Sequence, residues 1–242
     1  MEQLAGRFRV LAADLYGSGK SPSWPARRTL SLDDEVGLLE PVFAAAGERF
    51  HLIGHSYGGA VALKAALVHR KRIASLVLLE PSLFAILVAE DPHQPAAREI
   101  AAVRDATTAA LDRGDPAASA ECFIDYWIGP GAWAGMPEAR RGAIASAMTT
   151  VRAEWGALFA EPTPLAAFAR LDMETTLVVG TESPASSKGV ARVLARTLPR
   201  VRRVELPGVG HMAPITHPAP VHAAIAAHLE RAVSPSAALR RG

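Results

Sequence analysis

Ser56 stands at the centre of a pentapeptide, GHSYG at positions 54–58, that fits the pattern G-x-S-x-G, and a further glycine follows it. An apolar, β-prone run over residues 50–53 precedes the pentapeptide, and a segment with helical periodicity follows over 60–68. A serine on such a sharp strand-to-helix turn takes a strained backbone conformation, and we expect a Cβ at Gly54 or Gly58 to crowd the turn. The turn holds the hydroxyl at the positive end of the helix, which favours nucleophilic attack by Ser56.

His211 is the candidate base for Ser56, because a serine hydroxyl is a poor nucleophile until a base takes its proton. It lies in the loop LPGVGHMAP at 206–214, directly after the last expected strand, and a glycine-rich loop of this kind can bring an imidazole back over the strand ends. His55 directly precedes the candidate nucleophile and should point away from the site, and His217 is the nearest competitor. The alternative is a loop histidine that only caps backbone groups.

The elements that must position these residues alternate between strands and helices. Strands are expected at 8–13, 50–54, 73–79, 175–180 and 201–206, and helices at 31–46, 60–68, 184–198 and 219–232. The strands are largely apolar on both faces. The pattern therefore predicts an α/β fold with a mostly parallel sheet flanked by helices.

Helical periodicity dominates from residue 82 to 171, interrupted by prolines and glycines. We predict a helical cap insertion at 82–171 over the carboxyl edge of the sheet, with 1–81 and 172–242 forming the core and a frayed tail from Ser234. Aromatic residues in the cap can line an apolar pocket or simply pack the cap onto the sheet: Phe84, Phe123, Tyr126, Trp127, Trp133, Trp155 and Phe159.

Composition narrows the classes of function. The net charge of the 242 residues is only +2, and scattered arginine pairs give little support for nucleic-acid binding. Cys122, the only cysteine, excludes an intrachain disulfide, and we expect it to be buried; a cytoplasmic setting follows as the default. No leader or long apolar run suggests a membrane, and no nucleotide motif or metal-ligand set suggests a cofactor or a metal.

Three segments together resemble the α/β-hydrolase superfamily: DLYGSGKS at 14–21, GHSYGG at 54–59 and GVGH at 208–211. They occur in the family's order, and the resemblance spans residues 8 to about 232. It implies an α/β-hydrolase fold, a serine nucleophile under a helical cap, and a catalytic triad in the chain order serine, acid, histidine. Asp14 then shapes a loop beside the site and is not catalytic.

The resemblance places the triad acid usually three residues after Gly180, where this chain has Ser183, and Glu182 lies one residue early. Relatives resembling haloalkane dehalogenases carry the acid at the end of the strand that follows the nucleophile helix, and here that residue is Glu80. An acidic residue ending an apolar strand is costly unless it is paired, and an imidazolium would pair it. We favour Glu80 and keep Glu182 as the alternative, in which Glu80 pairs with an arginine of the cap.

The resemblance also implies an oxyanion hole of two backbone N–H groups, one of them from Tyr57. The other normally comes from a loop after an earlier strand, and the sequence contains no such segment. Residues 1–7 look like the helix tail that follows that loop. We therefore expect the N-terminal strands to be missing, through a misassigned start codon or in a degenerate, inactive member; losing one donor costs on the order of 10²–10³ in turnover.

We predict an α/β-hydrolase-type serine hydrolase that cleaves a small apolar carboxylic ester through an acyl-enzyme. Ser56 would be the nucleophile, His211 the base and then the acid, and Glu80 the orienting group. The alternatives are a non-catalytic binder of small ligands, a C–C hydrolase, lactonase or perhydrolase relative, or a structural partner in an oligomer. Epoxide or haloalkane hydrolysis is disfavoured, because those relatives carry aspartate in place of Ser56. The expected partner is a small-molecule substrate; its identity and the oligomeric state stay open.

Overall fold

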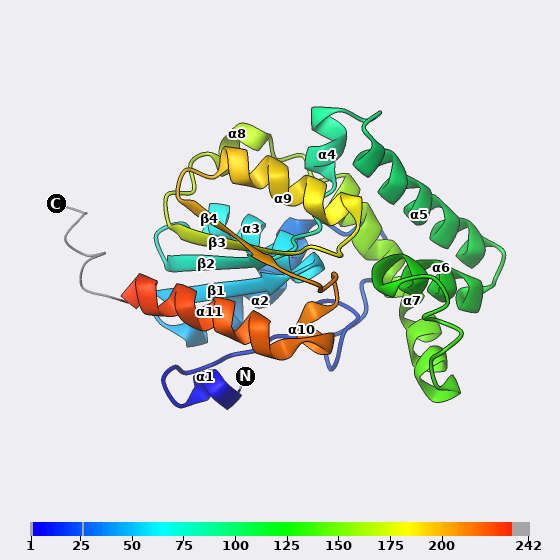
Figure 1. Cartoon of the computed structure of the whole chain (residues 1–242), viewed down its shortest axis with the longest axis horizontal. Helices are drawn as coiled ribbons and strands as arrows, with labels where there is room; N and C mark the ends of the chain where they lie inside the picture. The colour runs from blue at the N-terminus through cyan, green and yellow to red at the C-terminus, as the bar shows by residue number, and fades with distance from the viewer. Residues whose placement is uncertain (1, 26, 234–242) are drawn as a thin grey trace.

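The computed structural model describes residues 2–25 and 27–233, and its centre is a parallel sheet (Figure 1). Within the described residues the sheet has four strands in the order β1-β2-β3-β4: β1 (Phe50–His55), β2 (Ile73–Leu79), β3 (Glu174–Gly180) and β4 (Val201–Leu206). All the pairings between them are parallel. The predicted α/β class with a mostly parallel sheet is confirmed, and each of these strands lies within one residue of its expected bounds.

Helices cover both faces of the sheet because side chains alternate along β2. Leu76 and Leu78 pack with residues of α3 (Tyr57–Val68) and α9 (Ala185–Thr197). The intervening Val77 and Leu79 pack with residues of α11 (Pro218–Val233) on the other face. Figure 1 shows α9 and α11 on opposite sides of the strands, and α2 (Leu32–Ala46) packs against α3. This alternation is the period of two expected for a strand buried on both faces.

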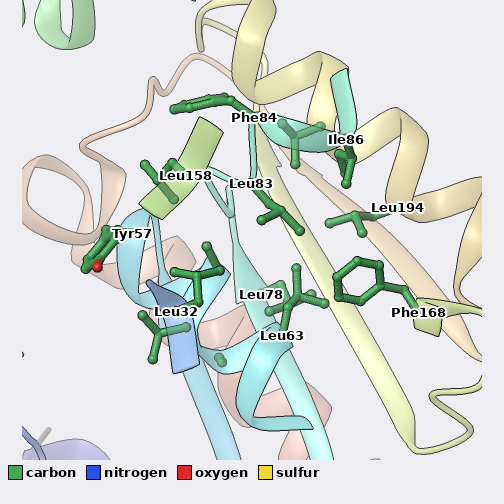
Figure 2. Packing of buried hydrophobic residues seen from close by; sticks show 14 of the residues in the cluster. Leu32, Tyr57, Leu63, Leu78, Leu83, Phe84, Ile86, Leu158, Phe168 and Leu194 are labelled. Carbon is green, nitrogen blue, oxygen red and sulfur yellow. The ribbon is translucent and has the colours of Figure 1, made fainter. Parts of the chain in front are cut away.

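The larger core lies between α3, α9 and the sheet. Figure 2 shows Leu63, Leu78, Leu83 and Phe168 directed into a shared interior, and each is at most 1% exposed. Burial of one such side chain contributes about 1.5–3 kcal/mol relative to an exposed one. This packing holds the strand ends and the start of α3 in a defined relation to one another.

A polar contact anchors α11 on the other face. His228 is fully buried and forms hydrogen bonds with Ser75 on β2 at 2.7 Å and with Thr176 on β3 at 2.8 Å. Burial, with Arg231 and His51 nearby, lowers the pKa of His228 to about 4. The imidazole is therefore neutral at physiological pH and serves both hydroxyl groups.

The prediction of a strand at residues 8–13 is wrong. The N–H of Phe8 donates to the carbonyl of Leu4 at the end of α1 (Glu2–Ala5), and residues 9–15 form neither helix nor strand. Leu11 is 40% exposed. Apolar composition favours β structure, but a strand forms only where a neighbour pairs with its backbone groups. Among the described strands, β1 pairs with β2 alone.

Residues between β2 and β3 form a set of helices, as their periodicity predicts: α4 (Ala85–Glu90), α5 (Pro95–Asp112), α6 (Pro116–Ile128), α7 (Glu138–Phe159) and α8 (Leu165–Phe168). Figure 1 shows α5, α6 and α7 gathered beside one end of the sheet. The division into a core of 1–81 and 172–242 and a cap of 82–171 stays a prediction. The predicted frayed tail from Ser234 lies outside the described residues.

Most of the aromatic residues between 82 and 171 pack against one another. Phe84 is fully buried and its ring contacts those of Trp127, Trp155 and Phe159. Trp133 belongs to a separate cluster that includes residues of α6 and α7. Cys122 is exposed, contrary to expectation, since it lies on α6 away from the face that buries Ala120, Ile124 and Trp127.

Candidate active site

Ser56 occupies the turn between β1 and α3 and has φ 52° and ψ −121°. This left-handed conformation costs a residue other than glycine on the order of 1–3 kcal/mol. Backbone hydrogen bonds hold it in place. The N–H of Ser56 donates to Leu79 O at 3.0 Å, and its carbonyl accepts from the N–H groups of Gly59 at 2.9 Å and Ser82 at 3.1 Å. The strained turn is therefore fixed to the residues that follow β2.

The two glycines of the pentapeptide differ in how tightly they are enclosed. A Cβ at Gly54 would lie 2.3 Å from the carbonyl oxygen of Gly58, so the expected crowding is present at Gly54. A Cβ at Gly58 would have no atom within 4 Å, so the same expectation is wrong at Gly58. The reason is geometric: Gly54 faces the backbone of the next turn, whereas Gly58 faces open space.

The structure brings Ser56, His211 and Glu80 together from three distant parts of the chain. His211 Nε2 lies 2.9 Å from Ser56 Oγ, and His211 Nδ1 lies 2.8 Å from Glu80 Oε2. His211 is 3% exposed and Glu80 is 4% exposed, whereas Ser56 is half-buried. Each residue follows the carboxyl end of a parallel strand, β1, β2 or β4, and these ends meet at one edge of the sheet.

Glu80 is held by several donors besides His211. Its Oε1 accepts from the N–H of Gly180 at 2.7 Å and from the hydroxyl of Ser183 at 2.5 Å. Burial by itself would raise the pKa of Glu80, but hydrogen bonding and charge from His211, with the donors Ser183 and Gly180, lower that pKa below its ordinary value. Glu80 is therefore an ionised carboxylate, and the side chain that contacts it is the ring of His211 rather than an arginine from residues 82–171.

Glu182 lies elsewhere. Its side chain is exposed and accepts a hydrogen bond from Thr181 at 3.3 Å, and no contact joins it to His211 in the described residues. Ser183, at the position where the resemblance places an aspartate, contacts the Glu80 carboxylate instead. Of the two acid positions that the resemblance offers, the one at Glu80 contacts the imidazole, and the one at Ser183 contacts the Glu80 carboxylate.

His55 lies beneath His211, although we expected its side chain to point away from the site. Its Nε2 donates to the carbonyl oxygen of His211 at 2.9 Å, and the two ring centroids are 4.9 Å apart. Burial first, and then the neighbouring His211, lowers the pKa of His55 to about 4. The contact spans 156 residues of sequence, and no local pattern signals it.

Trp127 also packs against the imidazole of His211. Its ring centroid lies 4.0 Å from that of His211 with a 30° angle between the planes, and the residue is 6% exposed. Ser187 Oγ also lies 3.3 Å from His211 Nδ1. An indole face stabilises a nearby cation, so this arrangement favours a protonated imidazole when one forms.

Tyr57 begins α3, so its backbone N–H belongs to the first turn, whose N–H groups have no acceptor within the helix. Its hydroxyl donates to Glu35 Oε1 at 2.9 Å, and the other oxygen of Glu35 accepts from the N–H of Tyr16 at 3.2 Å. Glu35 is fully buried, and this burial raises its pKa. The contacts fix Tyr57 beside Ser56, and its N–H has no intrahelical partner.

Asp14 takes part in loop structure. Its carboxylate accepts from the N–H of Lys20 at 3.1 Å, and its carbonyl accepts from the hydroxyl of Ser21 at 2.8 Å. Asp14 is exposed. These contacts are those of a residue that closes a turn.

A comparison with known families identifies the fold. The family described as alpha/beta hydrolase fold matches residues 1–218. The chain belongs to the α/β-hydrolase family. The predicted superfamily and its fold are confirmed, and the site lies where this α/β hydrolase brings its strand ends together.

Relatives of this α/β hydrolase include esterases and lipases. A pimeloyl-[acyl-carrier protein] methyl ester esterase of Chromobacterium violaceum is 28% identical over 244 residues, which cover 95% of this chain and 87% of the relative. Lipase LipV of Mycobacterium tuberculosis is 38% identical over 120 residues, 49% of this chain and 41% of the lipase. A thermophilic esterase from Thermogutta terrifontis, solved with malate bound, superposes with a TM-score of 0.73 at 26% identity, covering 96% of this chain and 84% of the esterase.

Two further observations concern membrane-spanning helices and metal ions. Across residues 2–25 and 27–233, no helix combines the length and apolar character needed to cross a membrane. The same part of the chain contains no cluster of three histidine, cysteine or acidic side chains arranged to hold a metal ion.

Proposed function

We propose that the protein is a serine hydrolase that cleaves small, apolar carboxylic esters through an acyl-enzyme on Ser56. The observation that carries the proposal is the run of hydrogen bonds from Glu80 through His211 to Ser56, at 2.8 and 2.9 Å. A carboxylate, an imidazole and a hydroxyl in this order can activate a serine. Ser56 is the proposed nucleophile, His211 the base and then the acid, Glu80 the orienting acid, and Tyr57 one oxyanion donor.

Acylation starts from a defined distribution of protons. The Glu80 carboxylate accepts a hydrogen bond from the N–H at Nδ1 of His211, so the proton of the neutral ring stays on Nδ1 and Nε2 faces the hydroxyl of Ser56 unprotonated. As Ser56 Oγ attacks the ester carbonyl, its proton passes to Nε2, and the carbonyl oxygen becomes an oxyanion near the Tyr57 N–H. Glu80 and the Trp127 ring stabilise the imidazolium that forms.

Collapse of the tetrahedral intermediate breaks the bond to the alcohol oxygen. His211 gives its proton to that oxygen, the alcohol leaves, and an ester remains on Ser56. Water then repeats the cycle: it gives a proton to His211, attacks the acyl carbon, and releases the carboxylic acid while Ser56 regains its proton.

Two observations support the substrate class. The three relatives named above are a methyl ester esterase, a lipase and a thermophilic esterase. Trp127 stacks on the imidazole and packs in turn against Phe84 and Phe123, so the candidate site adjoins an apolar aromatic cluster. Apolar surroundings of this kind favour a small, uncharged acyl or alcohol group over a charged one.

We also propose that residues 82–171 form a cap over this site. The contact of Trp127 on α6 with His211 supports the assignment, because it brings the helical segment directly against the reaction centre. We propose a cytoplasmic setting on the basis of the single cysteine.

A fluorophosphonate probe and p-nitrophenyl butyrate test the proposal. We expect stoichiometric labelling and ester hydrolysis by the wild-type protein. Ser56→Ala should abolish labelling and lower kcat by at least about 10³, because it removes the hydroxyl that contacts His211 Nε2 at 2.9 Å.

Ser146→Ala is the matched control, since Ser146 is an exposed serine whose hydroxyl donates to the carbonyl of Gly142 on the same helix. It should label and turn over like the wild type. A folded wild-type protein that neither labels nor hydrolyses esters contradicts the proposal and favours the non-catalytic binder of small ligands.

A further inference from the structure

A second buried hydroxyl touches the proposed nucleophile. Ser82 lies just after β2, is 3% exposed, and places its Oγ 3.1 Å from Ser56 Oγ. Its backbone N–H also donates to the carbonyl of Ser56 at 3.1 Å. Two contacts, one through the backbone and one through the side chains, therefore tie residue 82 to residue 56. The backbone contact delivers the Ser82 hydroxyl to the one atom that is proposed to react.

The direction of this hydrogen bond follows from counting protons along the site. Glu80 is ionised and accepts at both oxygens, from Gly180 and Ser183 at Oε1 and from His211 Nδ1 at Oε2. A neutral imidazole carries one N–H, so Nε2 is an acceptor, and the only proton of the Ser56 hydroxyl points to it. The Ser56 oxygen then has only lone pairs to offer Ser82.

We infer that the Ser82 hydroxyl donates a hydrogen bond to Ser56 Oγ and is a further catalytic residue, an inference that rests on the proposed function. Ser82 keeps its proton throughout. When the Ser56 proton moves to His211 and the bond from Oγ to the carbonyl carbon forms, the carbonyl π pair moves to the carbonyl oxygen. Partial negative charge builds on Oγ along this path, and a hydrogen bond to a charged oxygen is stronger than one to a neutral oxygen.

The stabilisation is confined to the attack step. After acylation Oγ is the bridging oxygen of an ester, which is a much poorer acceptor than an alkoxide-like oxygen. Ser82 therefore contributes to the step in which Oγ gains charge, and losing it should slow that step about 10- to 100-fold. Ser82 has no contact with the imidazole among the hydrogen bonds of the described residues, so the pH at which the rate is half-maximal should stay unchanged.

The rate of fluorophosphonate labelling isolates this step, because the probe reacts once with Oγ and needs no deacylation. We expect Ser82→Ala to lower the second-order labelling constant about 10- to 100-fold at every pH from 6 to 9, with the half-maximal pH unchanged. Ser82→Thr, which keeps the hydroxyl, should recover most of the rate. Ser82→Cys, with a weaker donor, should fall in between and serves if Ser82→Ala does not fold.

Ser119→Ala is the matched control. Ser119 is fully buried on α6 and donates to the carbonyl of Thr107 at 2.9 Å, so its loss also removes one buried hydrogen bond, away from the reaction centre. It should unfold at a lower temperature yet label at the wild-type rate. Labelling of Ser82→Ala at the wild-type rate, or a shifted half-maximal pH, overturns the role of Ser82 and leaves the serine hydrolase intact. An unlabelled wild-type protein overturns both.

Discussion

At the residue scale, the carboxylate that contacts the imidazole is itself supported from the second position at which the resemblance places an acid. Glu80 supplies the carboxylate from the end of β2, and Ser183, after β3, donates to that carboxylate at 2.5 Å. Glu80 has a positive φ of 45°, and Ser56 also has a positive φ, of 52°. Both residues are thus held in uncommon backbone conformations by the hydrogen bonds around them, as is frequent where side-chain direction matters for function.

The proposed role of Glu80 predicts a ranking of two variants. Glu80→Gln should lower kcat/KM for ester hydrolysis by about 10²–10⁴, because an amide can donate to Nδ1 and then leaves the proton on Nε2, where a base is needed. Glu182→Gln should change kcat/KM less than about twofold, since Glu182 is exposed and contacts Thr181. Steady-state kinetics on both variants measure this, and the reverse ranking would move the acid to Glu182.

At the scale of elements, the strand–turn–helix unit is what sets Ser56 above the sheet. β1 enters the turn with no room at Gly54, and α3 leaves it with open space at Gly58. The close approach at Gly54 brings the end of β1 against the first turn of α3. Only a residue without a Cβ permits it.

This difference predicts opposite effects of the same substitution. Gly54→Ala should destabilise the protein by about 3 kcal/mol, because its Cβ meets a backbone oxygen that cannot move without opening the turn. Gly58→Ala should be neutral, or stabilise by up to about 1 kcal/mol through better helix propensity. Urea unfolding of both variants decides the question, and equal losses of stability would contradict the geometry.

At the scale of the whole molecule, α7 and α2 bring two acidic side chains close to each other, Glu154 and Glu35. Glu154 on α7 is partly buried, and burial first, with Glu35 of α2 nearby, raises its pKa to about 8 from its ordinary 4.5. Glu35 in turn accepts a hydrogen bond from the hydroxyl of Tyr57, which lies beside Ser56. The charges of Glu154 and Glu35 therefore couple the packing of α7 to the position of Tyr57.

A raised carboxyl pKa fixes the sign of a pH effect on folding. The unfolded chain ionises Glu154 near pH 4.5 while the folded protein keeps it protonated up to about pH 8. The contribution of Glu154 to the free energy of unfolding is thus fully present below pH 4.5 and declines as the pH rises from 4.5 to about 8. Glu154→Gln should remove this decline and stabilise the protein by on the order of 1–3 kcal/mol at pH 9.

Urea unfolding at pH 5 and pH 9 measures the effect. Glu138→Gln, at an exposed glutamate on the same helix, is the control and should follow the wild type at both pH values. A Glu154→Gln variant whose stability declines between these pH values as steeply as that of the wild type would contradict the assignment.

The amino-acid sequence by itself determined the elements and the candidate chemistry. The period-two burial of β2, the helical segments and the turn chemistry around Ser56 are local properties, and local propensity and hydrophobic pattern specify them. His211 and Glu80 could also be predicted, because Glu80 directly follows an apolar strand, His211 lies in the glycine-rich loop after the last strand, and the resemblance supplies the chain order.

Only the tertiary structure decided which neighbours meet. Residues 8–13 have the composition of a strand but no strand to pair with, and pairing is a long-range property. The contacts of Ser82, Ser183 and His55 at the site join residues 26, 103 and 156 positions apart. No local pattern encodes such distances, since burial and hydrogen-bond partners depend on how the strand ends converge once the whole sheet has formed.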